Sequence, residues 1–305
     1  MRVLLTGAAG QVGSELARAL DGRAEVVAHD RSTLDLADAK AVANAVRDAK
    51  PALILNAAAY TAVDKAESEE GTAAAVNATA PGILAQEAKG CGALLVHYST
   101  DYVFDGAKGA PYVETDPTAP LGAYGRTKLE GERAIAASGC DHLVLRTSWV
   151  FAAHGQNFVR TMLRLGETRP ELRVVADQRG SPTSARDLAR ATLRILSGDG
   201  ALTPAGLQRV RGAGGIYHAT APGVTTWHAF AQQIFSEWAW RNGGRFVAPR
   251  VLPITTAEYP TPARRPAYSV LSNEKLLRVF GVALPGWRSG LGDVLEELLR
   301  ARAEA

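Results

Sequence analysis

A tyrosine and a lysine four residues apart, Tyr124 and Lys128, have the side chains in this sequence whose joint chemistry is easiest to name. On a helix, residues i and i+4 share a face, so the lysine charge can lie near the phenol. A nearby cation favours the ionised phenol and lowers its pKa from about 10. Such a tyrosine can exchange a proton near neutral pH. The same spacing is common in ordinary helices, so the pair gains meaning only from its surroundings.

Three glycines near the start of the chain predict a dinucleotide-binding turn. Gly7, Gly10 and Gly13 follow an apolar run and precede a helical pattern, which is the context that such a turn requires. Glycines let the backbone approach a pyrophosphate, and the start of the helix, with Gln11 and Val12, presents free N–H groups to it. The spacing is GxxGxxG rather than GxGxxG. A tight strand-to-helix turn without a ligand is the alternative.

The ends of the next two apolar runs offer further candidates for the cofactor site. Asp30 can accept hydrogen bonds from an adenosine ribose, whereas the adjacent Arg31 could hold a 2′-phosphate. The pair therefore does not decide whether the cofactor is NADH or NADPH. We also assign to this site Asp35, Leu36, Ala57, Ala58 and Ala59. A helix N-terminal carboxylate and a tightly packed core are the alternatives for these two segments.

Thr100 lies just past the fourth apolar run, at the edge of the predicted sheet where α/β proteins bind ligands. Its hydroxyl could donate to a substrate carbonyl and hold it beside Tyr124. A plain turn hydroxyl is the alternative.

Short apolar runs alternate with helical patterns in the first half of the chain, as in repeated βα units around a parallel sheet. The predicted strands are 2–6, 25–29, 52–56, 94–99 and 142–148, and the predicted helices are 13–20, 38–49, 72–89 and 126–137. Strands without polar alternation fit a sheet that is covered on both faces. We therefore predict an α/β fold, a Rossmann-type doubly wound parallel sheet with a smaller α/β substrate-binding cap lobe.

The second half of the chain is less regular. We predict helices at 158–165, 185–196, 226–239 and 291–302, strands at 172–176 and 216–219, a Gly-rich interruption at 197–215 and a Pro-rich segment at 249–266. This pattern predicts an NAD(P)-binding domain over 1–150, to which 185–215 return, and a mainly substrate-binding lobe over 151–305.

Composition excludes several classes of protein. The chain of 305 residues has a formal net charge of only +3 and no dense run of Lys and Arg, so we expect no nucleic-acid partner. No stretch approaches about 18 apolar residues, so we expect no membrane span. Two cysteines, Cys91 and Cys140, cannot build a disulfide framework, which favours a cytoplasmic protein.

The glycine turn, the strand ending in Ser99 and Thr100, and the Tyr124/Lys128 pair together resemble the short-chain dehydrogenase/reductase superfamily, in its extended branch that acts on nucleotide sugars. A closer resemblance is to the dTDP-4-dehydrorhamnose reductase family. The segments that carry it are STDYVFDG (99–106), YGRTKLEGE (124–132), RTSWVF (146–151), NFV (157–159), DQRGSPT (177–183) and PARRPAYSVL (262–271).

This resemblance implies a reaction and the residues that perform it. The family reduces the 4-keto group of dTDP-4-dehydro-β-L-rhamnose to dTDP-β-L-rhamnose with NADPH or NADH, in cell-surface polysaccharide biosynthesis. Tyr124 would be the general acid, Lys128 would lower its pKa and bind the nicotinamide ribose, and Thr100 would orient the keto oxygen. The residues implied to line the sugar pocket are Thr61, Val63, Thr100, Asp101, Tyr102, Val103, Phe104 and Trp149.

Two arginines and one tryptophan complete the implied substrate site, and a second tryptophan does not belong to it. Arg264 and Arg265 could bind the diphosphate, with a solvated surface pair as the alternative. Trp149 has a core role as its alternative. Trp227 falls at helical spacing with other apolar residues, so we expect it in the core of the cap lobe.

Some members of the family carry Mg²⁺ at a subunit contact, held by acidic side chains. Glu15 and Asp293 match two of those positions, but Arg186 stands at the third, and Asp187 beside it points elsewhere on a helix. A guanidinium cannot bind Mg²⁺. We therefore assign no metal site. The sequence does not decide whether the protein binds Mg²⁺ or whether it is a monomer or a homodimer.

Three other functions fit parts of the pattern. A nucleotide-sugar epimerase or dehydratase of the same branch would recycle its hydride, but epimerases usually have a YGP-like turn where this chain has Trp149, Val150 and Phe151. Another nucleotide-sugar 4-ketoreductase would share the same motifs. The regulatory subunit of methionine adenosyltransferase resembles this family without being an enzyme, and the presence of Tyr124, Lys128 and Thr100 together argues against it.

Overall fold

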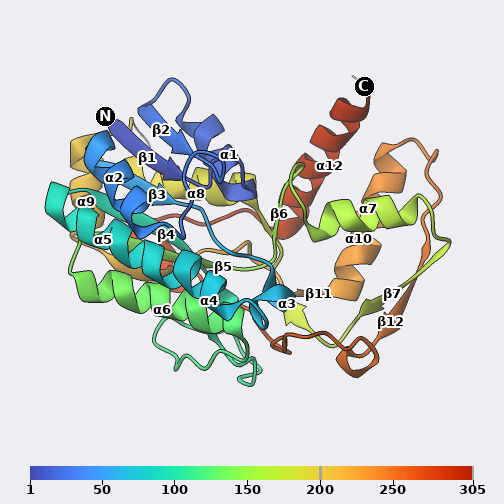
Figure 1. Ribbon diagram of the computed structural model, residues 1–305. Coiled ribbons are helices and arrows are strands. Elements are labelled where there is room, and N and C mark those ends of the chain that lie inside the picture. The colour runs from blue at the N-terminus through green and yellow to red at the C-terminus, as the bar shows by residue number, and fades with distance from the viewer. Residues whose placement is uncertain (199–200, 304–305) are drawn as a thin grey trace.

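The computed structural model describes residues 1–198 and 201–303, and its centre is a six-stranded parallel sheet (Figure 1). The strands, in their order across the sheet, are β10 (Gly215–His218), β5 (His142–Thr147), β4 (Leu94–Thr100), β3 (Leu53–Asn56), β1 (Arg2–Thr6) and β2 (Glu25–His29). The order reverses at β1, which pairs with β2 on one side and β3 on the other. In such sheets the crevice at the carboxyl ends of the strands beside this switch point binds the ligand.

Helices cover both faces of the sheet, as the apolar strands predict (Figure 1). Alternate strand residues such as Leu4, Ile54 and Leu95 pack against α2 (Ala39–Ala49), α5 (Ala80–Cys91) and α6 (Ala123–Ser138). The residues between them, such as Leu5, pack against α1 (Gln11–Leu20), α8 (Ala185–Ser197), α9 (Pro204–Arg211) and α11 (Glu274–Phe280). The predicted α/β fold is confirmed.

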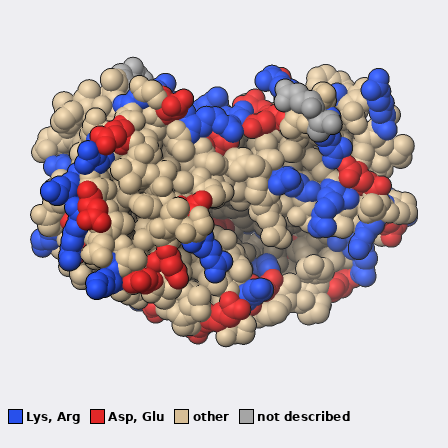
Figure 2. Space-filling view, turned by 45° about the horizontal axis from the view of Figure 1, so that its top comes forward, with Lys and Arg blue, Asp and Glu red and all other residues tan. Residues whose placement is uncertain are grey.

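A smaller unit with its own core lies beside the sheet. Its apolar residues come from α7 (Phe158–Gly166), α10 (Trp227–Arg241), α12 (Trp287–Ala303) and β7 (Glu171–Val175), which pairs with β12 (Arg250–Ile254). Two short strand pairs, β6 (Val150–Phe151) with β9 (Thr183–Ser184) and β8 (Arg179–Gly180) with β11 (Thr225–Thr226), complete it. The molecular surface is hollowed between this unit and the sheet (Figure 2).

Several elements differ from the sequence prediction. The predicted helix at 72–89 consists of α4 (Glu70–Ala74), the π-helical η1 (Ala75–Thr79) and α5. The Gly-rich interruption contains α9, and its residues 199–200 lie outside the described part of the chain. The Pro-rich segment contains β12, since Pro253 lies in a two-stranded sheet where its missing N–H is tolerated. In the described residues no helix is long and apolar enough to cross a membrane.

Candidate active site

The glycine turn lies at the sheet's switch point and is too tightly packed for side chains. Gly7 has a φ of 74°, and a Cβ there would come within 2.6 Å of the Ala58 nitrogen. A Cβ on Gly13 would lie 2.0 Å from the Gly7 carbonyl oxygen. Gly10 caps α1, in whose first turn lie Gln11 and Val12. The turn therefore brings the start of α1 and the end of β3 together, as a pyrophosphate site requires.

The predicted cofactor residues from Asp30 to Leu36 follow β2, the strand that pairs with β1. Asp30 follows β2, and its carboxylate accepts hydrogen bonds from the Ser32 hydroxyl at 2.6 Å and the Ser32 N–H at 2.9 Å, which lower its pKa. The neighbouring Arg31 is exposed. Asp35 accepts from the Ala37 N–H at 2.9 Å and begins no helix, because Asp38 caps α2. Leu36 lies in the core, so its side chain is not free for a cofactor.

The first turn of α6 places Tyr124 and Lys128 at the carboxyl end of β4. The helix begins at Ala123, whose N–H donates to the Glu67 carboxylate at 2.8 Å. A Cβ at Gly125 would lie 2.2 Å from the Tyr102 carbonyl oxygen, so this glycine lets α6 approach the chain after β4. Thr100, the last residue of β4, lies near enough to the half-buried Tyr124 phenol to affect its pKa. The predicted trio therefore comes together.

The electrostatics of the tyrosine differ from the prediction. Burial raises the pKa of Tyr124 to about 12, against the opposing effect of the Thr100 hydroxyl. Lys128 is not among the groups that shift the pKa of Tyr124. Burial lowers the pKa of Lys128 itself to about 8. The expected lowering of the tyrosine pKa is wrong for the protein alone: Tyr124 is a protonated donor at neutral pH, which suits a general acid.

A glycine turn at the switch point and a tyrosine, threonine and lysine beside it are what a nicotinamide-dependent ketoreductase needs. The model of the RmlD substrate binding domain matches residues 1–300. The dTDP-4-dehydrorhamnose reductase of Burkholderia thailandensis is 52% identical over 302 residues, which are 98% of this chain and 99% of that protein. The chain belongs to the dTDP-4-dehydrorhamnose reductase family.

Crystal structures of this family have the same overall fold. A dTDP-4-dehydrorhamnose reductase from Clostridium acetobutylicum is 39% identical with a TM-score of 0.88, and covers 98% of this chain and 100% of its own. The Bacillus anthracis reductase, solved in complex with NADP, is 35% identical with a TM-score of 0.87, and covers 97% and 99%.

Asp101 brings to the reductase site a carboxylate with one unpaired oxygen. It is buried and follows Thr100, whose hydroxyl donates to its Oδ1 at 3.1 Å. Its Oδ2 is also buried and has no hydrogen-bond partner in the described structure. Burial raises the pKa of Asp101 to about 6. A buried acceptor without a partner fits a hydroxyl donor from a bound sugar.

We expect Asp101→Asn to stabilise the ligand-free protein above pH 6. The pKa of Asp101 is about 6 in the folded protein and about 3.8 in the unfolded chain. Between these values the folded protein binds the proton more tightly, so the free energy of unfolding falls as the pH rises. Above pH 6 the ionised Asp101 lowers the free energy of unfolding by about 3 kcal/mol, and below pH 3.8 it has no effect. Urea unfolding at pH 7.5 and at pH 4 measures the difference.

Asp105→Asn is the control for this prediction. Hydrogen bonds from the Ala107 N–H and the Tyr112 hydroxyl lower the pKa of Asp105, so its removal has no stabilising effect at neutral pH. Equal stability of Asp101→Asn and the natural protein at pH 7.5 would show that the carboxylate costs nothing there.

The remaining predicted sugar-pocket residues divide into two groups. At the start of α3 (Val63–Ala66), Thr61 is exposed and Val63 is half-buried. The Tyr102 ring packs edge-on against Tyr124, with ring centroids 5.4 Å apart. Val103 and Phe104 are instead fully buried in a small core cluster, where Phe104 stacks on Tyr112. Their side chains therefore have no surface to offer a substrate, in contrast to the prediction.

Trp149 contacts the second unit, and Arg265, in the loop before α11, contacts α3. The Trp149 ring stacks on Trp227 with centroids 3.5 Å apart, and both rings are half-buried rather than in the core. Arg265 donates to Asp64 at 2.8 Å, and its charge acts to lower the pKa of Tyr102. Arg264 is exposed. Arg265 is thus held near the site, although part of its charge is already neutralised.

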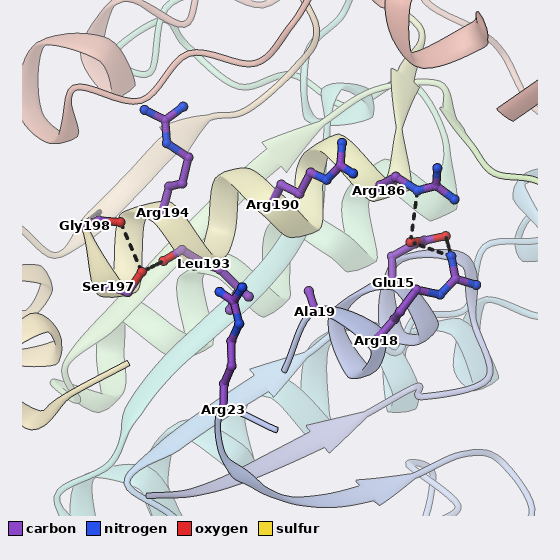
Figure 3. A pocket seen from close by; sticks show the side chains of 10 residues that line it. All are labelled: Glu15, Arg18, Ala19, Arg23, Arg186, Arg190, Leu193, Arg194, Ser197 and Gly198. Carbon is purple, nitrogen blue, oxygen red and sulfur yellow. Dashed lines mark hydrogen bonds and ion pairs between the residues drawn. The ribbon is translucent and has the colours of Figure 1, made fainter. Parts of the chain in front are cut away.

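The acidic residues implied for Mg²⁺ do not form a metal site. Glu15 lies 3.2 Å from Arg18 and 3.6 Å from Arg186, and Figure 3 shows both guanidinium groups beside its carboxylate. Arg186 also pairs with Glu297. Across 1–198 and 201–303, no three His, Cys, Asp or Glu side chains gather as metal ligands. Arginine cations already neutralise Glu15, so the residues present do not fit Mg²⁺.

Sequence reasoning missed a set of buried polar residues behind the reductase site. They are Thr6, Asn56, His97, Glu132 and Arg146. The available signal was a polar residue near the carboxyl end of otherwise apolar strands, as in LILN, LLVHYST and HLVLRT. Buried polar side chains require partners, so such interruptions predict a network.

Proposed function

We propose that this chain is an NAD(P)H-dependent oxidoreductase that reduces the 4-keto group of dTDP-4-dehydro-β-L-rhamnose to dTDP-β-L-rhamnose, in dTDP-rhamnose and polysaccharide biosynthesis. The observation that carries the proposal is the placement of Thr100, at the end of β4, and Tyr124, in the first turn of α6, at the sheet edge that also holds the glycine turn. Membership of the family over nearly the whole chain supports the choice of substrate.

The protein would hold the cofactor through groups already in place. The N–H groups at the start of α1 face the pyrophosphate, Asp30 or Arg31 meets the adenosine ribose, and Lys128 meets the nicotinamide ribose. When bound, NADPH or NADH supplies the hydride for the C4 carbon. The lack of room for a Cβ at Gly7 and Gly13 fits a turn whose backbone a dinucleotide can approach closely.

Side chains of this protein donate the proton and stabilise the negative charge that develops on the keto oxygen. Thr100 orients the keto oxygen with its hydroxyl. Tyr124, protonated at neutral pH, donates its phenolic proton to that oxygen as negative charge develops on it. The hydride and this proton together convert the ketone to the alcohol. Solvent then returns a proton to the Tyr124 phenolate, whose high pKa favours the protonated form.

The two parts of the chain, each with its own core, have different binding functions. We propose that residues 1–150, with the return of 185–215, bind the cofactor and that 151–305 mainly bind the sugar nucleotide. Trp149 and Arg265 support this, because both lie where the second unit meets the sheet's edge. We further propose that the enzyme works in the cytoplasm, as a monomer or homodimer.

A coupled assay tests the function. Purified protein is mixed with dTDP-4-dehydrorhamnose and either NADPH or NADH, nicotinamide oxidation is followed at 340 nm, and the sugar product is identified by NMR. We expect one nicotinamide oxidised per dTDP-rhamnose formed. Turnover of the sugar without net nicotinamide oxidation would instead indicate an epimerase or dehydratase, and cofactor binding without any turnover would indicate a regulatory protein.

A further inference from the structure

A line of three polar side chains crosses the sheet just behind the proposed site. Thr6 on β1, Asn56 on β3 and His97 on β4 are neighbours in register, and all three are buried. They stand on the face that α6 covers, at the strand ends nearest the glycine turn, where Leu4, Ile54 and Leu95 come before them in each strand. Their partners must therefore be found within the protein.

The line ends at the lysine of the proposed site. The Thr6 hydroxyl lies 2.7 Å from Asn56 Oδ1, and Asn56 Nδ2 lies 2.9 Å from His97 Nδ1. His97 Nε2 lies 3.0 Å from Lys128 Nζ. Lys128 also donates to the Tyr98 carbonyl oxygen at 2.6 Å. Two adjacent residues of β4 thus hold the ammonium group.

The protonation state of Lys128 determines whether His97 donates or accepts at Nε2. A lysine ammonium has three N–H donors and no acceptor, so His97 must accept at Nε2 and carry its proton at Nδ1. The Asn56 amide oxygen can accept a hydrogen bond from that Nδ1–H after a half-turn that exchanges the amide oxygen and nitrogen. With its nitrogen toward His97, as in the structure, the ring proton lies on Nε2 and suits an uncharged lysine. The orientation of Asn56 is therefore coupled to the charge of Lys128.

Two of the three lysine donors are occupied by β4, and one remains. A long, flexible lysine side chain would otherwise have many orientations, and fixing two donors sets the direction of the third. We propose that His97 is a positioning residue for Lys128, which holds the ammonium between β4 and α6 so that its remaining N–H is directed at the cofactor. This inference rests on the proposed function, in which Lys128 binds the nicotinamide ribose.

The ionisable surroundings of Lys128 are limited. Glu132 lies one turn later on α6 and favours the charged lysine, but its carboxylate is bound by Arg146 of β5. Tyr124 lies one turn earlier and is protonated at neutral pH. Burial and the Lys128 charge keep the pKa of His97 well below its usual value. His97 is thus uncharged, and it accepts from Lys128 while the lysine is protonated, below about pH 8.

Substitution of His97 tests the proposal on the cofactor-free protein first. In His97→Leu the ammonium loses an acceptor, so the pKa of Lys128, followed by ¹⁵N NMR and assigned with Lys128→Met, should fall by about one. The Kd for NADPH, measured by fluorescence, should rise about tenfold, and kcat/KM should fall ~10- to 100-fold. The basic limb of the kcat profile should move to lower pH. His97→Gln, whose amide oxygen can accept, should restore part of each change.

A matched control separates positioning from folding. Thr192→Val removes a buried hydroxyl that lies 2.8 Å from the Tyr98 hydroxyl, on the opposite face of β4. It should lower the melting temperature without changing the pKa of Lys128 or the Kd for NADPH. If His97→Leu does not fold, His97→Met carries the same expectation, because a flexible thioether side chain fits irregular core spaces.

The outcomes also distinguish this inference from the proposed function. A His97→Leu protein with an unchanged Lys128 pKa and an unchanged Kd for NADPH would overturn the positioning role, even if the sugar is reduced normally. A natural protein that binds NADPH and reduces no sugar would overturn the proposed function. The lysine pKa, which needs neither cofactor nor substrate, would still decide the role of His97 in that case.

Discussion

Tyr124→Phe should lower kcat for reduction of the keto sugar by about 10²- to 10⁴-fold, the usual contribution of a positioned general acid. The substitution removes only the hydroxyl, and the ring can keep its edge-on contact with Tyr102. The Kd for NADPH should not change. Because the pKa of Tyr124 is about 12, the loss should be the same at pH 6 and at pH 9. Steady-state kinetics at both values, with NADPH fluorescence titration, measure these effects.

Tyr217→Phe is the matched control for this variant. Its hydroxyl donates to the Ala213 carbonyl oxygen at 2.6 Å, and the ring belongs to the core on the other face of the sheet. This variant should turn over like the natural protein. If Tyr124→Phe retained more than about a tenth of the natural kcat, the proton would have to come from another group, and the assignment of Tyr124 would be wrong.

The parts of the fold that follow local rules were predictable from sequence. The five main strands and the helix α8 were placed within a residue or two, because apolar periodicity and capping residues such as Asp38 and Ser184 act locally. The glycine turn was predictable for the same reason, since a tight strand-to-helix turn and a close backbone approach both require glycine.

What was missed depends on contacts between distant residues. Helix α6 begins before its predicted start because Glu67, far away in sequence, accepts from its first N–H. The π-helical η1 surrounds Asn77, which binds both the backbone of Tyr60 and the Thr127 hydroxyl. No window of sequence contains these partners. The pKa of Tyr124 was misjudged likewise, because burial, not the lysine one turn away, dominates it.

Arg146→Met should lower the free energy of unfolding by about 3–5 kcal/mol, because it leaves Glu132 buried and unpaired. The two side chains are both buried, and Arg146 donates to Glu132 through Nε at 2.9 Å and Nη2 at 2.6 Å. Ser99 donates to the same carboxylate at 2.5 Å. This cluster attaches α6 to β4 and β5 one turn beyond Lys128. Urea unfolding at pH 7.5 measures the loss.

Two further variants show whether the loss comes from the unpaired charge. Arg126 lies on α6, as Glu132 does, and Arg126→Met breaks its exposed pair with Glu70 of α4, which should cost less than about 1 kcal/mol. Replacing both partners, in Glu132→Leu with Arg146→Met, should recover much of the stability, because two apolar side chains need no partner. If the double variant is no more stable than Arg146→Met, the cost lies in lost packing of Arg146 on Phe104, whose ring centre is 5.1 Å from the guanidinium, and not in the unpaired carboxylate.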